Sequence, residues 1–347
     1  MSTTQLAAAP ESAEKDTGRR PLRYRYPLGA MILRRILAGI ATVFAASALV
    51  YAAIMVLPGD VATVILGRNA TPERIAEVEA QLNLDAPVYE RYFQFLGDLF
   101  TGNLGYSTAG LVQGVQIPVA DIIGPAFANS AVLAAVTMIL FIPLALGLGL
   151  LTGIRAYKPT DHVVSMTSLA ISALPEFLVA SALITIFFSW LGWLPPISAI
   201  PAGDVALSHP DMMALPVLTL LTVSLAFGSR MLRATVIDVM AQDYVTMARL
   251  SGFPAREVIR KYVLPNSLVS TVQIFAQQLQ YLIGGIIVVE AVFNYPGIGS
   301  TLVRAIAVRD TQEIVVIATI LAATYILINL VADLICIVLD PKIRTAV

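Results

Sequence analysis

Charged residues are scarce in this sequence. Only 13% of its 347 residues are Asp, Glu, Lys or Arg, whereas soluble globular domains carry about 25%. Hydrophobic residues make up 57% of the chain, more than a soluble core requires and typical of a protein that faces lipid. The net charge of −1 gives no field that would attract nucleic acid. The composition therefore predicts an integral membrane protein that does not bind nucleic acid.

Residues that hold metals or perform catalysis are also few. Cys336 is the single cysteine, which excludes an internal disulfide and a cysteine metal cluster. The two histidines, His162 and His209, lie far apart, and the chain contains no HExxH or GxSxG motif. We therefore expect no metal site, no cofactor bound by this chain and no catalytic residue.

The chain also lacks a Walker A loop, which ends in Gly-Lys-Ser or Gly-Lys-Thr. Its four lysines are followed by Asp, Pro, Tyr and Ile (Lys15, Lys158, Lys261 and Lys342). The chain is therefore not expected to be an enzyme by itself. If its function is driven by ATP, the nucleotide and Mg²⁺ must bind to partner ATPase subunits.

What the sequence has instead is long apolar runs. A helix needs roughly 20 apolar residues to cross the bilayer, and six such runs predict an all-α fold of six transmembrane helices: 36–57, 129–154, 163–191, 214–234, 269–290 and 315–338. The polar segment 1–28 is predicted to be a disordered tail. The first helix, 29–57, is longer than the apolar part of a usual signal peptide, so we expect it to stay uncleaved.

The distribution of basic residues predicts the topology. With the N-terminus in the cytoplasm, 17 of the 22 Lys and Arg residues lie on the cytoplasmic side, as the positive-inside rule favours. Both termini and the segment 235–268 are then cytoplasmic, and the segment 58–128 is extracytoplasmic. Residues 129–347 form the predicted transmembrane core.

The segment 58–128 is too long for a simple loop. Helices are predicted to start at Thr71, followed by Pro72, and at Pro87. In the second helix, aromatic and apolar residues recur at helical spacing and predict one buried face (Tyr89, Phe93, Leu96 and Phe100). This face either packs on the membrane domain or meets a partner.

The basic segment between the fourth and fifth runs, "TMARLSGFPAREVIRKYVLPNSL", is predicted to form two short helices. Gly252 is expected to adopt a left-handed conformation at the end of the first, and Pro254 to begin the second. Glu257 and Lys261 are predicted to pair, and Pro265 to end the second helix before the fifth span.

This segment has three candidate roles: docking to a cytoplasmic protein, contact with anionic lipid, or a plain connector. Val245, Ala248 and Gly252 fall on one side of the first helix, where small residues would permit close approach. Docking is the interpretation that the helix-turn-helix shape favours.

The same segment resembles the EAA loop of ATP-binding-cassette importer permeases. The family pattern is Glu-Ala-Ala, three residues, Gly, nine residues and Ile-x-Leu-Pro. Here the first triplet is Thr246-Met247-Ala248, the glycine is Gly252, and the pattern closes on Leu264-Pro265 with its spacing intact. The Glu, the first Ala and the Ile of the pattern are replaced.

Further motifs resemble the dipeptide/oligopeptide branch of these permeases, in particular its B-type subunit. They follow one another in the family's order: "LPGD" at 57–60, "LNLDAPVYERYFQFLGDLFTGNLGYS" at 82–107, "FNYPGIGSTLVRAIAVRD" at 293–310 and "LDPKIR" at 339–344. The resemblance covers nearly everything from about residue 30 onwards.

The resemblance implies a multi-pass protein of a bacterial plasma membrane, with four kinds of partner. These are a second, C-type permease, two ATPase subunits, an extracytoplasmic substrate-binding protein and the lipid bilayer. It also implies that the EAA-type loop transmits ATP-driven movement to the spans. The residues expected to couple to the ATPases are Thr246, Met247, Ala248, Gly252, Phe253, Arg256, Leu264 and Pro265.

Polar residues within the apolar runs are candidates for the translocation path, because each is costly unless it faces water or a partner. For a charged side chain near the middle of a span the cost is roughly 2.5–3.5 kcal/mol on insertion scales. The candidates are Gln273, Gln277 and Gln280 in the fifth run, Ser172 and Glu176 in the third, and Asp333 in the sixth. The alternative is that they form hydrogen bonds that merely hold the helices together.

The expected function is therefore that of a permease subunit importing di- or oligopeptides. On the same scaffold the cargo could instead be nickel, glutathione or another small solute. A self-contained secondary transporter is the alternative from another class. Such transporters often contain internal inverted repeats, and no repeat is visible here.

Overall fold

A computed structural model describes residues 27–56, 66, 70–81, 86–201 and 203–339 of the chain. In this part of the chain the fold is helical, apart from an isolated bridge between Tyr106 and Pro118. The prediction of an all-α fold is thus confirmed. The predicted disordered tail, the "LPGD" motif and most of "LDPKIR" lie outside the described residues.

Within the described ranges, five helices are long and apolar enough to cross a membrane. They are α1 (Pro27–Val56), α6 (Val119–Ile154), α9 (Pro210–Met240), α12 (Leu264–Phe293) and α14 (Thr311–Leu339). The observed helices extend beyond the predicted apolar runs, because helical hydrogen bonding continues through polar ends. The largest difference is at α6, which begins at Val119 rather than at residue 129.

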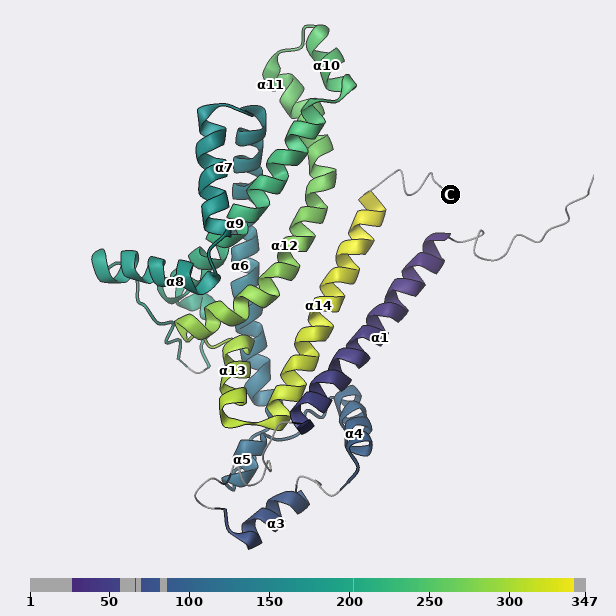
Figure 1. Ribbon diagram of the computed structural model, residues 1–347, viewed down its shortest axis with the longest axis vertical. Coiled ribbons are helices and arrows are strands. Elements are labelled where there is room, and N and C mark those ends of the chain that lie inside the picture. Colours follow the sequence, from purple (N-terminus) through teal and green to yellow (C-terminus); the bar gives the residue numbers. More distant parts are fainter. Residues whose placement is uncertain (1–26, 57–65, 67–69, 82–85, 202, 340–347) are drawn as a thin grey trace, which may run out of the picture.

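The predicted third span is not one continuous helix. It consists of α7 (Pro159–Ser172) and α8 (Glu176–Ile184), which continues through a π-helical turn, Thr185–Trp190, and the two parts are bent by 106°. Pro175 lies in the break. Because proline lacks an N–H group and disfavours helical geometry in the residue before it, the helix cannot run through. Figure 1 shows α8 projecting sideways from the bundle.

Shorter helices occupy the two ends of the bundle (Figure 1). At one end lie α10 (Asp243–Leu250) and α11 (Ala255–Val258). At the other end lie α3 (Pro72–Gln81), α4 (Val88–Thr101), α5 (Thr108–Val112) and α13 (Ile298–Val308). The helices predicted after Pro72 and Pro87 are confirmed.

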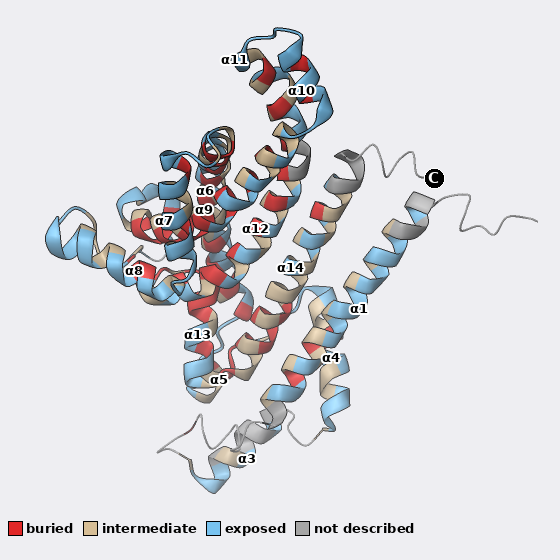
Figure 2. Ribbon diagram, turned by 45° about the horizontal axis from the view of Figure 1, so that its top comes forward, coloured by how far each residue is buried: buried red, intermediate tan, exposed pale blue. Residues whose placement is uncertain are grey.

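The core of the bundle lies where α6, α9 and α12 pack together, and Figure 2 shows the buried residues gathered there. Glycines let α6 and α9 approach closely. A Cβ atom at Gly149 would lie 2.4 Å from the Leu232 Cβ, and one at Gly153 would lie 2.5 Å from Cγ1 of Val236. Small residues at helix contacts are the usual means of close packing within a membrane.

The second packing unit joins α1, α14 and α4. The hydroxyl of Tyr92 on α4 donates to the Phe44 carbonyl of α1 at 3.1 Å and lies 2.9 Å from the Ser47 hydroxyl. These contacts turn Phe95 and Leu96 inward. Tyr89, Phe93 and Phe100 are 63%, 66% and 76% exposed. Packing of the predicted aromatic face on the membrane domain is therefore wrong for three of its four members, and contact with a partner stays a prediction.

Candidate functional site

The α10–α11 hairpin, residues 243–263, projects from the end of the bundle around a small core of its own. Val245, Ala248, Val258 and Val263 are buried together and pack on Val236 of α9. This core joins the hairpin to α9, and the chain runs from the hairpin directly into α12.

Gly252 makes the turn between the two helices. Its φ of 82° lies in the left-handed region, as predicted, and its N–H donates to the Arg249 carbonyl at 3.1 Å. The next N–H, of Phe253, reaches the Ala248 carbonyl at 3.3 Å. These two bonds close the end of α10, an arrangement that glycine favours because it has no Cβ.

The outer side of the hairpin forms an exposed surface, which we call the tip surface: Thr246, Met247, Leu250, Phe253 and Arg256. Met247 and Leu250 are 63% and 79% exposed. The predicted approach face is wrong, because Val245 and Ala248 are buried in the hairpin core. Helical geometry at this position turns the residues beside them outward instead.

The second half of the hairpin runs directly into α12. The predicted ion pair between Glu257 and Lys261 is confirmed, with Oε1 and Nζ 2.6 Å apart. This hydrogen bond raises the pKa of Lys261. Pro265 was predicted to end the second helix of the hairpin. It lies instead in the first turn of α12, which begins at Leu264. A proline is tolerated there because the first N–H groups of a helix have no internal partner.

One face of α12 is exposed along its length. The exposed positions recur every three or four residues: Gln273, Gln277, Tyr281, Gly284 and Val288. Two of the three predicted glutamines thus lie on this open face. Ile274 and Leu282, which lie on other sides of the same helix, are buried at 6% and 0% exposure.

The third glutamine, Gln280, points elsewhere. Its Nε2 donates to Oδ1 of Asn329 on α14 at 3.0 Å, which is a contact between helices. Gln278, which the sequence analysis did not single out, is buried and donates to the Ser224 hydroxyl of α9 at 3.0 Å. Its Oε1 has no hydrogen-bond partner.

Two charged side chains flank the break between α7 and α8. The carboxylate of Glu176 accepts a hydrogen bond from the Tyr281 hydroxyl of α12. Four residues earlier, the Ser172 hydroxyl accepts a bond of 3.2 Å from Nη1 of Arg230 on α9. The structure thus brings one predicted path residue, Glu176, to the open side of α12, and another, Ser172, against α9. Arg230 was not predicted.

Asp333 lies apart from this group. Its carboxylate pairs with Arg35 of α1, which joins α14 to α1. Another ion pair that the sequence analysis missed joins Asp161 of α7 to Arg233 of α9. The sequence could not indicate this ion pair, because an acidic and a basic residue 72 positions apart show no local pattern.

A buried carboxylate also organises the opposite end of the bundle. Glu290 of α12 is fully buried and accepts hydrogen bonds from the Gly299 N–H at 2.7 Å, the Ser300 N–H at 3.2 Å and the Ser130 hydroxyl. The "YPGIGS" loop thus wraps around one side chain. A Cβ at Gly297 would lie 2.0 Å from Glu290 Oε1, so this close approach requires glycine.

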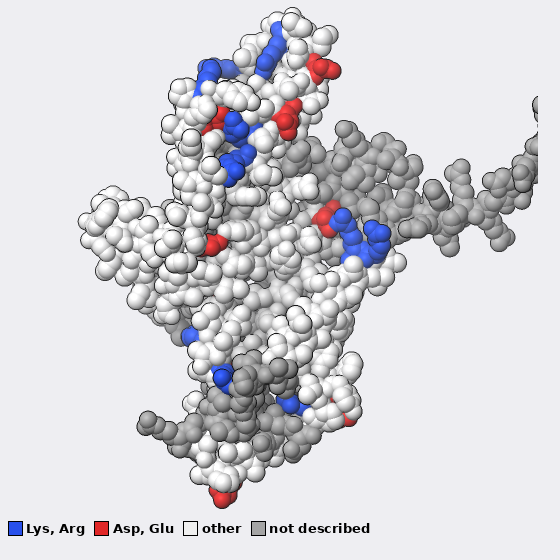
Figure 3. Space-filling view, in the orientation of Figure 1, with Lys and Arg blue, Asp and Glu red and all other residues white. Residues whose placement is uncertain are grey.

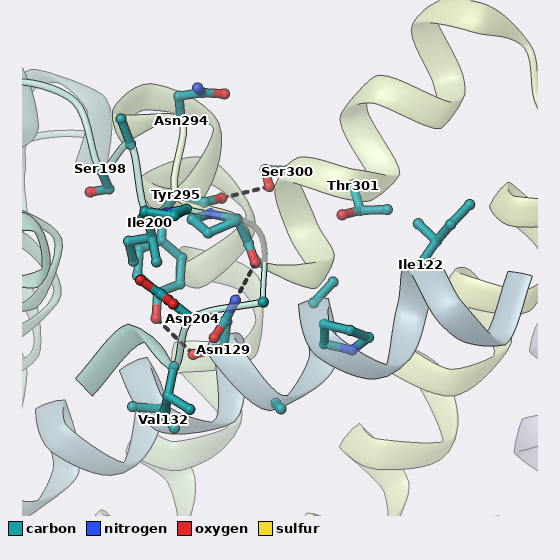
Figure 4. A pocket seen from close by; sticks show the side chains of 18 of the residues that line it. Ile122, Asn129, Val132, Ser198, Ile200, Asp204, Asn294, Tyr295, Ser300 and Thr301 are labelled. Carbon is teal, nitrogen blue, oxygen red and sulfur yellow. Dashed lines mark hydrogen bonds between the residues drawn. The ribbon is translucent and has the colours of Figure 1, made fainter. Parts of the chain in front are cut away.

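A pocket of about 680 Å³ opens beside this loop, between the start of α6, the segment before α9 and α13 (Figure 4). Tyr295 donates its hydroxyl to the Asn129 carbonyl at 2.9 Å, and burial raises the pKa of Tyr295. The Asp204 carboxylate at its rim lies 2.9 Å from Nε2 of His209. Several polar groups of this pocket are therefore already engaged within the chain.

No group of three or more His, Cys, Asp or Glu side chains that could hold a metal ion occurs in the described ranges. On the face seen in Figure 3, charged side chains gather near the α10–α11 end, near the opposite end and in a cluster of both signs at mid-height on the right, and most of the remaining surface is uncharged. This distribution is that of a protein whose middle lies in a membrane.

Two families of known proteins together match residues 29–345 of the chain. Residues 29–148 match the family described as the N-terminal part of the membrane component of binding-protein-dependent transport systems. Residues 145–345 match the family "Binding-protein-dependent transport system inner membrane component".

Curated relatives are similar over almost their full length. The glutathione transport system permease proteins GsiC of Escherichia coli strain K12 and of Shigella dysenteriae serotype 1 are both 33% identical to the chain over 315 residues. The match covers 90% of this chain and 98% of each relative. The chain therefore belongs to the family of inner membrane components of binding-protein-dependent transport systems, the permease subunits of ATP-binding-cassette importers.

Proposed function

We propose that this permease subunit imports short peptides, with glutathione, itself a tripeptide, among them. Its relatives are named for glutathione transport, and the motifs at 82–107 and 293–310 resemble permeases of the dipeptide/oligopeptide branch. The two readings share one chemical class of cargo. Nickel or another small solute is the alternative cargo, and the described part of the chain contains no cluster of His, Cys, Asp or Glu that would favour nickel.

The observation that supports the coupling role is the tip surface. Met247 and Leu250 are large apolar side chains that are more than half exposed at the far end of a polar hairpin. Exposed apolar side chains of this kind are typical of protein docking sites. We infer that an ATPase subunit covers the tip surface and that the hairpin core transmits its movement to α9 and α12.

In this proposal the α10–α11 hairpin lies in the cytoplasm, together with both termini, and the pocket beside Tyr295 opens on the extracytoplasmic side. A second permease subunit completes the path, and a binding protein delivers the peptide. Gln273, Gln277, Ser172 and Glu176 line the path on the open side of α12. Gln280 and Asp333 hold helices together.

The test is to purify the complex through a tag on this chain, with Met247→Glu and Leu250→Glu as variants of the tip surface. We expect the unaltered chain to co-purify with ATPase subunits and a second permease, and both variants to lose the ATPases while keeping the permease. Arg260→Glu, an exposed change on the other half of the hairpin, is the matched control. ATPase recovery at full level from both tip variants would overturn the proposal.

A further inference from the structure

Two charges of opposite sign stand on the open side of the membrane bundle without an ionic partner. In the described part of the chain the ion pairs include neither Glu176 nor Arg230. Each of the two is hydrogen-bonded only to a neutral hydroxyl, of Tyr281 and Ser172 respectively. Charged groups inside a membrane normally pair with each other, face water or mark a substrate pathway.

The carboxylate lies near the middle of the membrane. Tyr281, which holds it, is 10 residues after the start of the apolar part of α12 at Thr271 and 12 before its end at Phe293. At 1.5 Å per residue, these are about 15 Å and 18 Å along the helix axis. Glu176 and Tyr281 cannot reach the headgroup region from there. The open side of their contact must therefore meet water, cargo or another protein chain.

The surroundings of Glu176 and Arg230 contain polar groups and open space. Gln277 precedes Tyr281 by one helical turn on the same exposed face of α12, and Gln273 precedes it by two. Arg230 lines a recess of about 310 Å³ between α7 and α9, together with Ser165. Lipid would leave these amide groups and charges unsatisfied, which a membrane protein avoids.

The spacing of the two charges limits what can bridge them. Arg230 contacts Ser172, and Ser172 is four residues from Glu176, so the Cα atoms of Ser172 and Glu176 are at most about 14 Å apart. An extended di- or tripeptide spans about 7–10 Å from its ammonium to its carboxylate. Flexible Glu and Arg side chains can cover the difference. A metal ion would need no guanidinium.

We propose that Glu176 and Arg230 form a binding site for the two termini of a short peptide within the membrane. Glu176 takes the ammonium group, held in place by Tyr281, and Arg230 takes the carboxylate. The glutamines on α12 contact the peptide groups between them. This inference rests on the proposed function, because it requires that the open side of α12 belongs to the path.

The experiment uses the whole transporter, purified through a tag on this chain, and measures cysteine protection. Gly284→Cys is introduced in a Cys336→Ala background. Gly284 is exposed on the same face as Tyr281, and a Cβ there meets no atom within 4 Å. A hydrophilic thiol reagent is added, and labelling of this chain alone is followed by its mass.

The probes are trialanine, S-methylglutathione, trialanine blocked at both ends, and nickel chloride. At a concentration about ten times that giving half protection, a bound peptide should slow labelling about tenfold by mass action. We expect protection by trialanine and S-methylglutathione only. Glu176→Gln and Arg230→Gln should each raise the protecting concentration about tenfold or more, because each removes a charge-assisted hydrogen bond.

Asp238→Asn, an exposed charge change near the end of α9, is the control and should leave protection unchanged. Equal protection by the blocked peptide, protection unaffected by both charge variants, or no protection at all would each overturn the site. Absence of labelling in every nucleotide state would show that another chain covers this face, and would overturn it too. Co-purification of the ATPases with every variant reports separately on the proposed function.

Discussion

Arg233 of α9 holds the carboxylate of Asp161 with two hydrogen bonds, from Nε to Oδ1 at 2.5 Å and from Nη2 to Oδ2 at 2.7 Å. The Tyr157 N–H and the Ser165 hydroxyl donate to the same carboxylate at 2.8 Å and 3.1 Å. Asp161 is 1% exposed. One side chain thus fixes the turn before α7 to the helix that leads into the α10–α11 hairpin.

Removing one partner of this pair should destabilise the protein. Asp161→Asn leaves the guanidinium without its counter-ion. Breaking a fully buried ion pair costs about 3–5 kcal/mol, and the cost here should be smaller because the Arg233 side chain is partly exposed. We expect the thermal unfolding midpoint of the purified complex to fall. The double variant Asp161→Asn/Arg233→Met should lose less than the sum of the two single changes, since it leaves no charge unpaired.

Strictly additive losses in that cycle would show that the two side chains do not interact. Arg260→Gln, at an exposed position, serves as the control and should change the midpoint little.

The turn at Gly252 provides a second prediction. Gly252→Val places a β-branched residue at a φ of 82°, a conformation that costs an ordinary residue about 1–2 kcal/mol. We expect the chain to insert and express, but to recover less ATPase in a pull-down. Space is not limiting, because a Cβ there meets nothing within 4 Å.

Gly252→Asn separates strain from other effects, because asparagine visits the left-handed region more readily than valine. It should recover most of the ATPase association. If Gly252→Asn and Gly252→Val behave alike, the backbone conformation at this turn is not what matters for docking.

Much of the fold could be predicted from the sequence, because apolar length and the positions of prolines and glycines are local signals. Signals of this kind indicated the helix starts at Pro72 and after Pro87, the left-handed Gly252 and the Glu257–Lys261 pair. The sideways course of α8 is different. Pro175 explains why the third run breaks, but the direction of a bent helix depends on what it packs against.

The polar side chains could be predicted as a set but not sorted into roles. Three glutamines share a stripe of α12 in the sequence, and the fold separates them, because Asn329 of α14 captures Gln280. Buried groups such as Glu290, Asp310 and Gln278 were missed. Their partners are donors from other segments, as when Asp310 accepts from the Ser107 hydroxyl at 2.5 Å, 203 residues earlier in the chain.

Close packing of α6 on α9 gives a third prediction with a control on the same helix. Gly149→Ala would place a methyl group 2.4 Å from the Leu232 Cβ, whereas Gly147→Ala meets no atom within 4 Å. Overpacking of this type costs about 1–3 kcal/mol. The thermal unfolding midpoint should fall for Gly149→Ala and stay the same or rise for Gly147→Ala. Equal midpoints would mean that α6 and α9 can separate at no cost.

The double role of Asp310 gives a fourth prediction. Its carboxylate accepts from the N–H groups of Thr108 and Ala109, at the start of α5, and from the Glu313 N–H, at the start of α14. Asp310→Ala removes the cap of two helices at once, and each lost cap costs about 1 kcal/mol. We expect faster proteolysis between α5 and α6 in the purified protein. Glu90→Ala, at an exposed position of α4, should leave the cleavage rate unchanged.

The last prediction concerns access to the open face of α12. Cysteines introduced singly for Gln273 and Gln277, in the Cys336→Ala background, should react with a small hydrophilic thiol reagent, and the nucleotide state should change the rate. Those replacing Ile274 and Leu282 should stay protected, because these positions are 6% and 0% exposed. The Gln280→Cys variant should react more slowly than Gln277→Cys, since that position faces Asn329. Resistance of Gln273→Cys and Gln277→Cys in every nucleotide state would mean that the stripe is packed against another chain and that the path runs elsewhere.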